Sequence, residues 1–400
     1  ARKYDANGEA LTFSKELVHN ATTLGDQSEP RAAAQGEDGY VAVWQSVMGG
    51  NDWDVRGRRF DTTGAPLGGE FTANATTTNW QTSPVLGTDA TGNFVVAWQS
   101  VGQDGDVEGV FFRRFSANGV PIGVDVMANQ KTQNEQYQPA IAMDRAPGAN
   151  GNFLLAWTSF EQIPSSGYDV VGRCFSAAGN ALNNEFVVNT NTTNDQIQPA
   201  VAVLPSVDPP VDPRYVVVWQ SKNEDGDNFG VYAQCLSITC SLVGSPFKVN
   251  TVTTNTQSQP AVAASSTGSF VVTWRSLSGT NWDIYAQQFD NLCAPVGSNF
   301  KVNPVGTGEQ SSPAVAFLSD DTLLAGWMTI GEDESGAAVK FLHYKTNYTA
   351  DGHEFLGNIY YAQDQDSPRI VPLPDAAYGI LWRSVGQDGA DGTIVGRVLP

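Results

Sequence analysis

The stretch Gln257-Ser-Gln-Pro-Ala-Val-Ala-Ala264, followed five residues later by Phe270-Val-Val-Thr-Trp-Arg-Ser276, decides the fold. Both halves are short and almost continuously apolar, which is typical of strands that are buried on both faces. The segment between them contains Gly268, a residue that favours a tight turn. The same pair of runs returns along the chain, so the sequence is built from repeats.

Two columns of residues define the repeat. A tryptophan closes the second run, at intervals of 53 to 62 residues, at Trp44, Trp98, Trp157, Trp219, Trp274, Trp327 and Trp382. The motif Gln-x-x-Pro opens the first run at Gln27, Gln81, Gln136, Gln196, Gln257, Gln310 and Gln365. An acidic, glycine-containing loop, a third run and a fourth run complete each repeat. We name the four expected strands A to D from the centre outward.

This pattern predicts an all-β protein, a seven-bladed β-propeller of four-stranded antiparallel blades, with a linear stack of blades as the alternative. One domain spans residues 1–400, with blades at about 27–74, 81–129, 136–189, 196–250, 257–303, 310–359 and 365–400. The last repeat lacks a D strand, and residues 13–20 resemble one. We therefore expect residues 1–20 to supply the outer strand of the last blade and close the ring. Residues 1–4 either hang free or pair with a neighbouring molecule, which suggests self-association.

Composition excludes two classes of partner. The chain has 22 Lys and Arg against 42 Asp and Glu, a formal charge of -20, so a phosphate-binding surface for nucleic acid is not expected. No apolar run approaches the roughly 20 residues of a membrane helix, which excludes membrane insertion by a helix.

The loops between strands B and C share one face of the expected disc with the D–A connections, and every repeat places a carboxylate there. Glycine-containing Asp-x-Asp spacing suits Ca²⁺, although the runs are too short for an EF-hand loop. Ca²⁺ is the only cofactor expected. Its candidate ligands are Asp104, Asp106, Asp225, Asp227 and Asp388. The alternatives are Asx turns, in which each aspartate caps its own backbone, and direct contact with a ligand.

The repeated tryptophans are expected to pack between blades, whereas three others fall in loops of the same face. Trp53, Trp80 and Trp282 lie near polar residues, including Asn51 and Asn281. Such aromatic and amide side chains suit a sugar, and we interpret these five residues as candidate ligand-binding residues. The alternative is that each ring folds onto its neighbouring blade.

Cysteine spacing suggests one disulfide. Cys235 and Cys240 flank a single C–D turn and are expected to cross-link that hairpin, while Cys174 and Cys293 each lack a partner on their own blade. The seven repeated glutamines either bind backbone between blades or line the channel.

Catalytic motifs are absent at the repeated positions. Three histidines lie in different repeats without a nucleophile motif near them, so we expect no enzyme activity. A glycosidase needs only two placed carboxylates, so it stays as a further alternative.

The motifs Phe94-Val-Val-Ala-Trp-Gln-Ser100, Asp104-Gly-Asp106, Arg113-Arg-Phe115 and Glu185-Phe-Val-Val-Asn189 are similar to repeats of large secreted bacterial surface proteins that carry propeller modules. More distantly, the chain resembles the seven-bladed bacterial lectins. The resemblance implies an extracellular or cell-surface location in a bacterium. It also implies a non-enzymatic adhesion module that binds a glycan or a surface protein, with a structural subunit of a surface layer or filament as the alternative.

Overall fold

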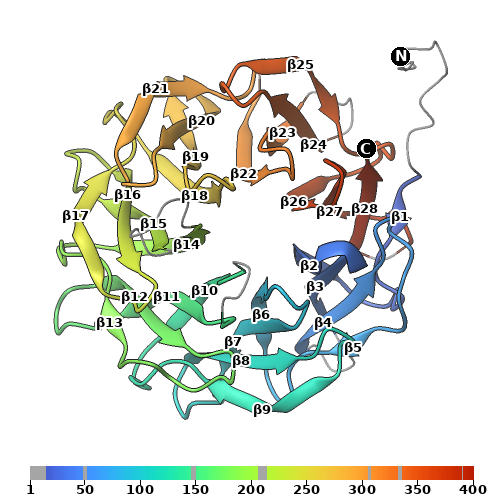
Figure 1. Cartoon of the computed structure of the whole chain (residues 1–400), viewed down its shortest axis with the longest axis horizontal. Coiled ribbons are helices and arrows are strands. Elements are labelled where there is room, and N and C mark those ends of the chain that lie inside the picture. The colour runs from blue at the N-terminus through green and yellow to red at the C-terminus, as the bar shows by residue number, and fades with distance from the viewer. Residues whose placement is uncertain are drawn as a thin grey trace.

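The computed structural model describes residues 15–47, 52–145, 150–205, 214–304, 308–331, 336–389 and 391–400. These residues form seven four-stranded antiparallel sheets arranged around a central channel (Figure 1). The predicted all-β, seven-bladed propeller is confirmed. Within the described ranges the helical content is the single 3-10 turn η1 (Gly36–Asp38), and no helix there has the length and apolarity to cross a bilayer.

Each blade contains four strands in chain order from the channel outward, except that the outer strand of blade 7 comes from the start of the chain. The strands of blades 1 to 3 are β2 (Gln27–Ala34), β3 (Tyr40–Val47), β4 (Trp53–Phe60), β5 (Phe71–Thr72), β6 (Gln81–Thr88), β7 (Phe94–Val101), β8 (Glu108–Phe115), β9 (Pro121–Met127), β10 (Gln136–Met143), β11 (Phe153–Phe160), β12 (Tyr168–Phe175) and β13 (Phe186–Val187). Those of blades 4 and 5 are β14 (Gln196–Leu204), β15 (Arg214–Lys222), β16 (Phe229–Ser237), β17 (Leu242–Lys248), β18 (Gln257–Ala264), β19 (Phe270–Ser278), β20 (Asn281–Phe289) and β21 (Pro295–Lys301). Those of blades 6 and 7 are β22 (Gln310–Phe317), β23 (Leu323–Ile330), β24 (Ala337–Tyr344), β25 (Ala350–Leu356), β26 (Gln365–Pro372), β27 (Tyr378–Ser384), β28 (Thr393–Leu399) and β1 (Leu17–Val18).

The ring closes as the sequence predicts. β1 pairs antiparallel with β28, with Leu17 opposite Gly396 and Val18 opposite Val395. Figure 1 shows the two strands side by side at the junction of the blue and red ends of the chain. The edge that an open last blade would expose is thereby covered. The expected self-association through residues 1–4 lies outside the described residues.

Every A strand carries a β-bulge within its Gln-x-x-Pro motif. In β18, for example, the register shifts between Ser258 and Ala261, and Gln259 adopts a φ of 55°. The residue before the proline has a φ of 51° to 55° in all seven blades, namely Glu29, Ser83, Gln138, Gln198, Gln259, Ser312 and Ser367. A bulge re-aims a side chain, and these seven residues line the same cavity at one mouth of the channel.

Large aromatic side chains fill the space between blades. The seven repeated tryptophans are no more than 2% exposed, and each joins an interblade cluster of valine, leucine and phenylalanine side chains. A blade cannot bury both of its faces alone, so the core of this fold is a set of interfaces around the ring.

A buried asparagine at the end of each D strand joins the strands of its blade to the next blade. The Oδ1 of Asn189 accepts a hydrogen bond from the backbone N–H of Val170 at 2.8 Å. Its Nδ2 donates to Asp169 at 2.8 Å and to the repeated Gln196 at 3.2 Å. The same backbone contact recurs at Asn20, Asn74, Asn129, Asn250, Asn303 and Asn358. We call these seven residues the asparagine nodes.

Replacing Asn189 with alanine is expected to lower the free energy of unfolding by about 3 kcal/mol. The substitution removes a hydrogen-bond partner from a buried carboxylate, a buried amide and a backbone N–H. Urea unfolding would measure the loss. The control is Asn180→Ala at an exposed turn position of the same blade, which should change stability by less than about 0.5 kcal/mol. Equal effects of the two substitutions would contradict the role of the node.

Acidic residues within the D strands, or directly before them, hold neighbouring blades together. Glu185 of blade 3 accepts hydrogen bonds from the backbone N–H groups of Gln130 and Lys131, at 2.6 and 3.0 Å, in the connection that leads into its blade. Glu16, Glu70 and Asp125 make the equivalent contacts in blades 7, 1 and 2. We call this contact the carboxylate clasp. Part of the acid excess is therefore used to anchor backbone.

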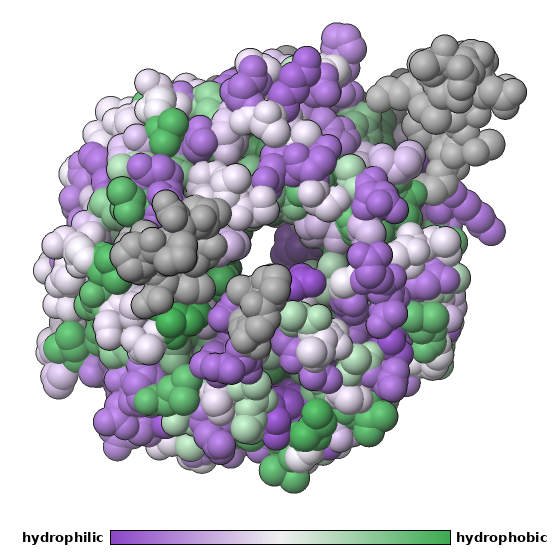
Figure 2. Space-filling model, in the orientation of Figure 1, coloured by the Kyte–Doolittle hydropathy of each residue, from purple (hydrophilic) through white to green (hydrophobic). Residues whose placement is uncertain are grey.

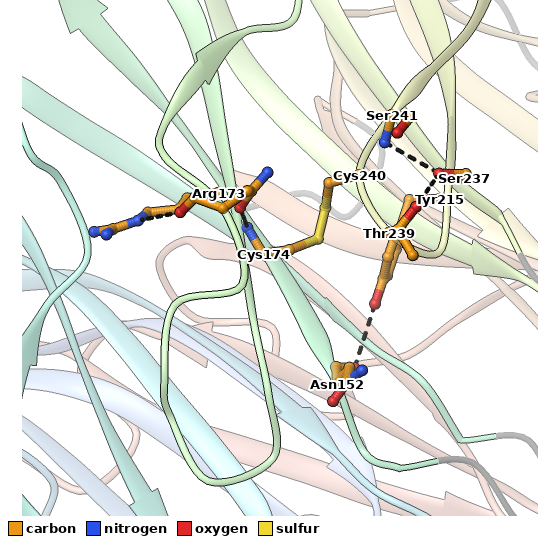
Figure 3. The surroundings of a disulfide bond; sticks show 9 residues. Asn152, Arg173, Cys174, Tyr215, Ser237, Thr239, Cys240 and Ser241 are labelled. Atoms are coloured by element: carbon orange, nitrogen blue, oxygen red, sulfur yellow. Dashed lines mark hydrogen bonds between the residues drawn. A yellow bond between two sulfur atoms is a disulfide. The ribbon is translucent and has the colours of Figure 1, made fainter.

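Two disulfides connect blades 3, 4 and 5. Cys174 bonds Cys240 and Cys235 bonds Cys293, with Cα separations of 6.2 and 6.8 Å. Figure 3 shows Cys174, on a strand of one blade, reaching Cys240 in the turn of the next. The predicted Cys235–Cys240 pairing is wrong, because within that hairpin Cys235 lies opposite Val243.

Candidate active site

The acidic B–C loops direct their carboxylates to separate partners. Asp104 accepts a hydrogen bond from the node Asn129 at 3.0 Å. Asp106 instead accepts one at 2.8 Å from a backbone N–H of the connection to the next blade. Asp225 and Asp227 make the same two contacts in blade 4. The members of each pair are therefore engaged at different places.

Asp388 also has protein partners. It accepts a hydrogen bond from the hydroxyl of Thr393 and another, at 3.5 Å, from the node Asn20. Over the described ranges, no group of three or more His, Cys, Asp or Glu side chains is placed to hold a metal ion. The contacts favour the structural interpretation of these loops, and Ca²⁺ binding by the five aspartates stays a prediction.

The three candidate tryptophans lie in two settings, two at the start of a C strand and one in a connection between blades. Trp282 is at the start of β20, half-buried, with the guanidinium of Arg275 4.0 Å from its ring centroid. Trp53 is half-buried at the start of β4. Trp80 is 53% exposed in the connection between blades 1 and 2. Asn281 is exposed at the start of β20, and Asn51 lies outside the described residues.

The repeated glutamines are buried and do not line the channel. Gln136 donates from Nε2 to the backbone carbonyls of Gln133 and Asn134 at 2.9 and 3.1 Å. Its Oε1 accepts a hydrogen bond from the node Asn129. The expectation of backbone bonding is confirmed, and these side chains tie each D–A connection to its A strand.

The residues that do face the channel mouth stand two to four positions after the repeated glutamines. They enclose a cavity of about 300 Å³, lined by Glu29, Arg31, Ser83, Gln138, Pro139, Gln198, Pro199, Gln259, Pro260, Ser312, Pro313, Ser367 and Arg369. The channel is open through the centre of the ring, and strongly hydrophilic residues border it on the side of β26 and β2 (Figures 1 and 2). The charged lining residues come from blades 7 and 1, which meet there.

Six charged side chains gather at this junction, and we call them the charged cluster. They are Asp26, Glu29, Arg31, Asp366, Arg369 and Arg383. Arg383 bridges the two blades, since it donates to Asp26 at 3.0 Å and to Asp366 at 3.1 Å. A guanidinium shared by two carboxylates fixes the orientation of both.

The carboxyl groups of Glu29 and Asp366 have pKa values displaced in opposite directions. Partial burial of Glu29 acts to raise its pKa, but the charges of Arg31, Arg369 and Arg383 outweigh it, so the pKa lies below its usual value. Arg31 contacts Glu29 directly, Nη2 to Oε2, at 3.3 Å. Burial raises the pKa of Asp366, and the negative charge of Glu29 adds to the rise, although Arg383 opposes it. The surroundings therefore favour the ionised form of Glu29 and the protonated form of Asp366 relative to the free side chains.

The signal that could have located this site is departure from the repeat. At the position of Glu29 the other blades have Ser or Gln, and at that of Asp366 they have Ser, Thr, Tyr or Ile. Arg31 and Arg369 occupy a column that is otherwise Val85, Ala140, Ala200, Ala261 and Ala314. The repeat motif does not include these positions, because only blades 7 and 1 have charged residues there.

Comparison with known proteins identifies the class of fold. The chain has a TM-score of 0.53, at 10% identity, to a Dyadobacter fermentans protein of unknown function, covering 80% of this chain and 94% of that one. It has a TM-score of 0.51 to the NanB sialidase of Streptococcus pneumoniae, at 8% identity over 98% of this chain and 71% of that one. It has a TM-score of 0.51 to an α-L-arabinanase of Penicillium chrysogenum, at 13% identity over 96% and 98%.

At these identities the likeness establishes the propeller fold alone. No family model and no curated protein sequence matches the chain. The similarity to bacterial surface-protein repeats and lectins therefore stays an interpretation of the motifs.

The expectation of a non-enzymatic adhesion module is wrong. Two solved structures that share the fold are, by their names, a sialidase and an arabinanase, which are glycan-cleaving enzymes. The histidines and the repeated positions of the sequence had indicated no catalytic motif. The structure instead gathers carboxylates with opposed pKa shifts at positions that break the repeat.

Proposed function

We propose that this protein is a glycoside-cleaving enzyme whose active site is the charged cluster at the channel mouth. The observation that carries the proposal is the pair Glu29 and Asp366, two neighbouring carboxyl groups whose environments shift their pKa values in opposite directions, downward for Glu29 and upward for Asp366. Glycoside hydrolysis requires one carboxylic acid to protonate the leaving oxygen and one carboxylate to activate water or attack the sugar. Carboxyl groups with divergent pKa values are suited to these two roles.

The residue roles follow from the directions of the pKa shifts. Asp366, with its raised pKa, would donate a proton to the glycosidic oxygen. Glu29, with its lowered pKa, lines the cavity and would act as the base or nucleophile at the anomeric carbon. Arg383 contacts both Asp26 and Asp366 and would act as a positioning residue.

Trp80 is the candidate aromatic side chain that best suits a sugar subsite. It directly precedes Gln81, as Asp26 precedes Gln27 one blade earlier, and the residue is 53% exposed. Replacing Trp80 with alanine is expected to raise KM for a polysaccharide about tenfold, since stacking of this kind is worth on the order of 1 kcal/mol or more, with little change in kcat. The control is Trp282→Ala, which removes a ring covered by Arg275. Equal KM values for the two variants would contradict the subsite.

Activity should follow a bell-shaped pH profile with its maximum between the pKa values of Glu29 and Asp366. The rate falls as pH drops through the lowered pKa of Glu29, which then gains a proton. It falls again as pH rises through the raised pKa of Asp366, which then loses its proton.

The substitution Arg31→Ala removes a charge that lowers the pKa of Glu29, so the acidic limb of kcat/KM should move to higher pH. The substitution Lys345→Ala removes an equal charge at an exposed position of blade 6 and should leave the profile unchanged. An acidic limb that stays in place in Arg31→Ala would show that Glu29 does not titrate in catalysis.

Release of reducing ends from a panel of plant and bacterial polysaccharides tests the proposed activity. We also propose an extracellular location, since two disulfides persist in an oxidising compartment. Detection of the protein in culture supernatant of its source cells would test this part.

A further inference from the structure

Arg31 and Arg369 form a matched pair at the channel mouth. They follow the prolines of adjacent A strands, β2 and β26, and line the same cavity. Each donates from Nη1 to the carbonyl of the proline before it, at 2.9 Å for Arg31 and 2.7 Å for Arg369. The two guanidinium groups are therefore presented in the same local geometry.

The pair retains donor capacity that its protein partners do not use. A guanidinium has five N–H donors. Among the described residues Arg369 donates one hydrogen bond, to the carbonyl of Pro368, and forms no ion pair with a carboxylate. Arg31 contacts Pro30 and Glu29. By contrast, Arg383 directs three N–H groups at Asp26 and Asp366.

The two guanidinium groups also repel each other. Burial and the charge of Arg31 lower the pKa of Arg369 to about 9. The charged residues that line the cavity are Arg31, Arg369 and Glu29, which leaves one net positive charge. The charged cluster as a whole has three arginines and three carboxyl groups, in a chain with 22 basic and 42 acidic residues. Basic groups are therefore concentrated at this mouth of the channel.

We propose that Arg31 and Arg369 together bind the carboxylate of an acidic sugar. This rests on the proposed function, since the pair lies beside the carboxyl groups that would cleave the glycosidic bond. The planar fork of a guanidinium matches a carboxylate in a bidentate arrangement. An anion between the two groups satisfies their free donors and relieves their repulsion. The cavity, at about 300 Å³, is at the lower end of the range for small-molecule sites and suits a single sugar ring.

Calorimetric titration of the native chain with galacturonate, glucuronate and N-acetylneuraminate tests the proposal, with galactose and glucose as neutral counterparts. At least one sugar acid is expected to bind about tenfold more tightly than the neutral sugars. Tighter binding of the uronates would identify a uronate as the source of the carboxylate, and tighter binding of N-acetylneuraminate would identify a sialic acid. Added salt should weaken this binding. Equal affinity for acids and neutral sugars would overturn the proposal, and so would acetate or inorganic phosphate binding as tightly as the sugar acids.

The variant Arg369→Ala introduces the residue that four other blades have at this position, so the fold should tolerate it. It should lose the preference for sugar acids, and Arg369→Lys should recover only part of it, because an ammonium lacks the fork. A preference that survives in Arg369→Ala would contradict the role of the pair. Sugar acids that bind as expected without any glycoside cleavage would refute the proposed function alone. Cleavage of neutral glycans that is unaffected by Arg369→Ala would refute the carboxylate site alone.

Discussion

Replacing Glu29 with glutamine is expected to lower kcat for glycoside hydrolysis about 10³-fold, the size of effect typical of a lost acid–base or nucleophilic carboxylate. The amide cannot accept a proton or attack the anomeric carbon. The fold should be unaffected, because blades 3, 4 and 5 have glutamine at the same bulge, in Gln138, Gln198 and Gln259, with φ values of 53° to 55°. Initial rates of reducing-end release would measure the loss.

The matched control is Glu161→Gln, which makes the same chemical change at an exposed position of blade 3. It should leave kcat within a factor of two of the native value, a difference of less than about 0.5 kcal/mol. If Glu29→Gln retained more than a tenth of the native rate, the assignment of Glu29 would be wrong.

Removing the Cys174–Cys240 disulfide is expected to lower the free energy of unfolding by about 2 to 4 kcal/mol. The bond joins residues 66 positions apart, so the unfolded chain gains considerable freedom when it is lost. The interface between blades 3 and 4 also lacks the carboxylate clasp, because Pro246 stands where Glu185 stands one blade earlier. We therefore expect this interface to depend on the disulfide.

The double variant Cys174→Ser with Cys240→Gly isolates the bond. Cys240 has a φ of 63°, and glycine occupies this turn position in blades 1 to 3, so the substitution introduces no backbone strain. Denaturant unfolding would give the free energy of unfolding of this variant and of the reduced native chain. Reduction breaks both disulfides, so it should cause the loss seen in the variant plus a further loss from Cys235–Cys293. Native stability that does not change on reduction would contradict the prediction.

The sequence alone predicts the architecture because the residues that build a blade recur in every blade. Trp274 packs, and Gln257 forms hydrogen bonds, in the same way as their counterparts around the ring. The strand pattern of one repeat is a weak indication of a blade, but seven copies of it together predict the propeller. Ring closure follows from the same count, since a missing outer strand and a spare one lie at opposite ends of the chain.

Interactions between blades could not be deduced from a single repeat. Cys235 and Cys240 are five positions apart, yet each pairs with a cysteine of an adjacent blade. The paired residues meet because a C strand of one blade lies against the C–D turn of the next. The aspartates of the B–C loops are explained in the same way, since Asp106 and Asp227 bond to connections that lead into the following blade.

The candidate site was missed for a related reason. The residues that all blades share, such as the repeated glutamines and the asparagine nodes, form hydrogen bonds that hold the blades in shape. Chemistry at the channel mouth instead depends on positions where one or two blades differ from the rest. Glu29 and Asp366 are such positions. Burial is the largest influence on both pKa values, and Arg31 and Arg383 act within the same blades, but Arg369 acts on Glu29, and Glu29 on Asp366, across a blade junction that the sequence separates by more than 300 residues.

The most direct test of the account compares the native chain with a variant in which the charged cluster is returned to the repeat. This variant carries Glu29→Gln, Arg31→Ala, Asp366→Ser and Arg369→Ala, each of which introduces a residue found at the same column in other blades. Reducing-end release from the polysaccharide panel is measured for both chains, with circular dichroism to confirm equal folding. We expect the native chain to cleave at least one polymer and the variant to cleave none. Equal cleavage by both chains, or no cleavage of any polymer by the native chain, would contradict the account.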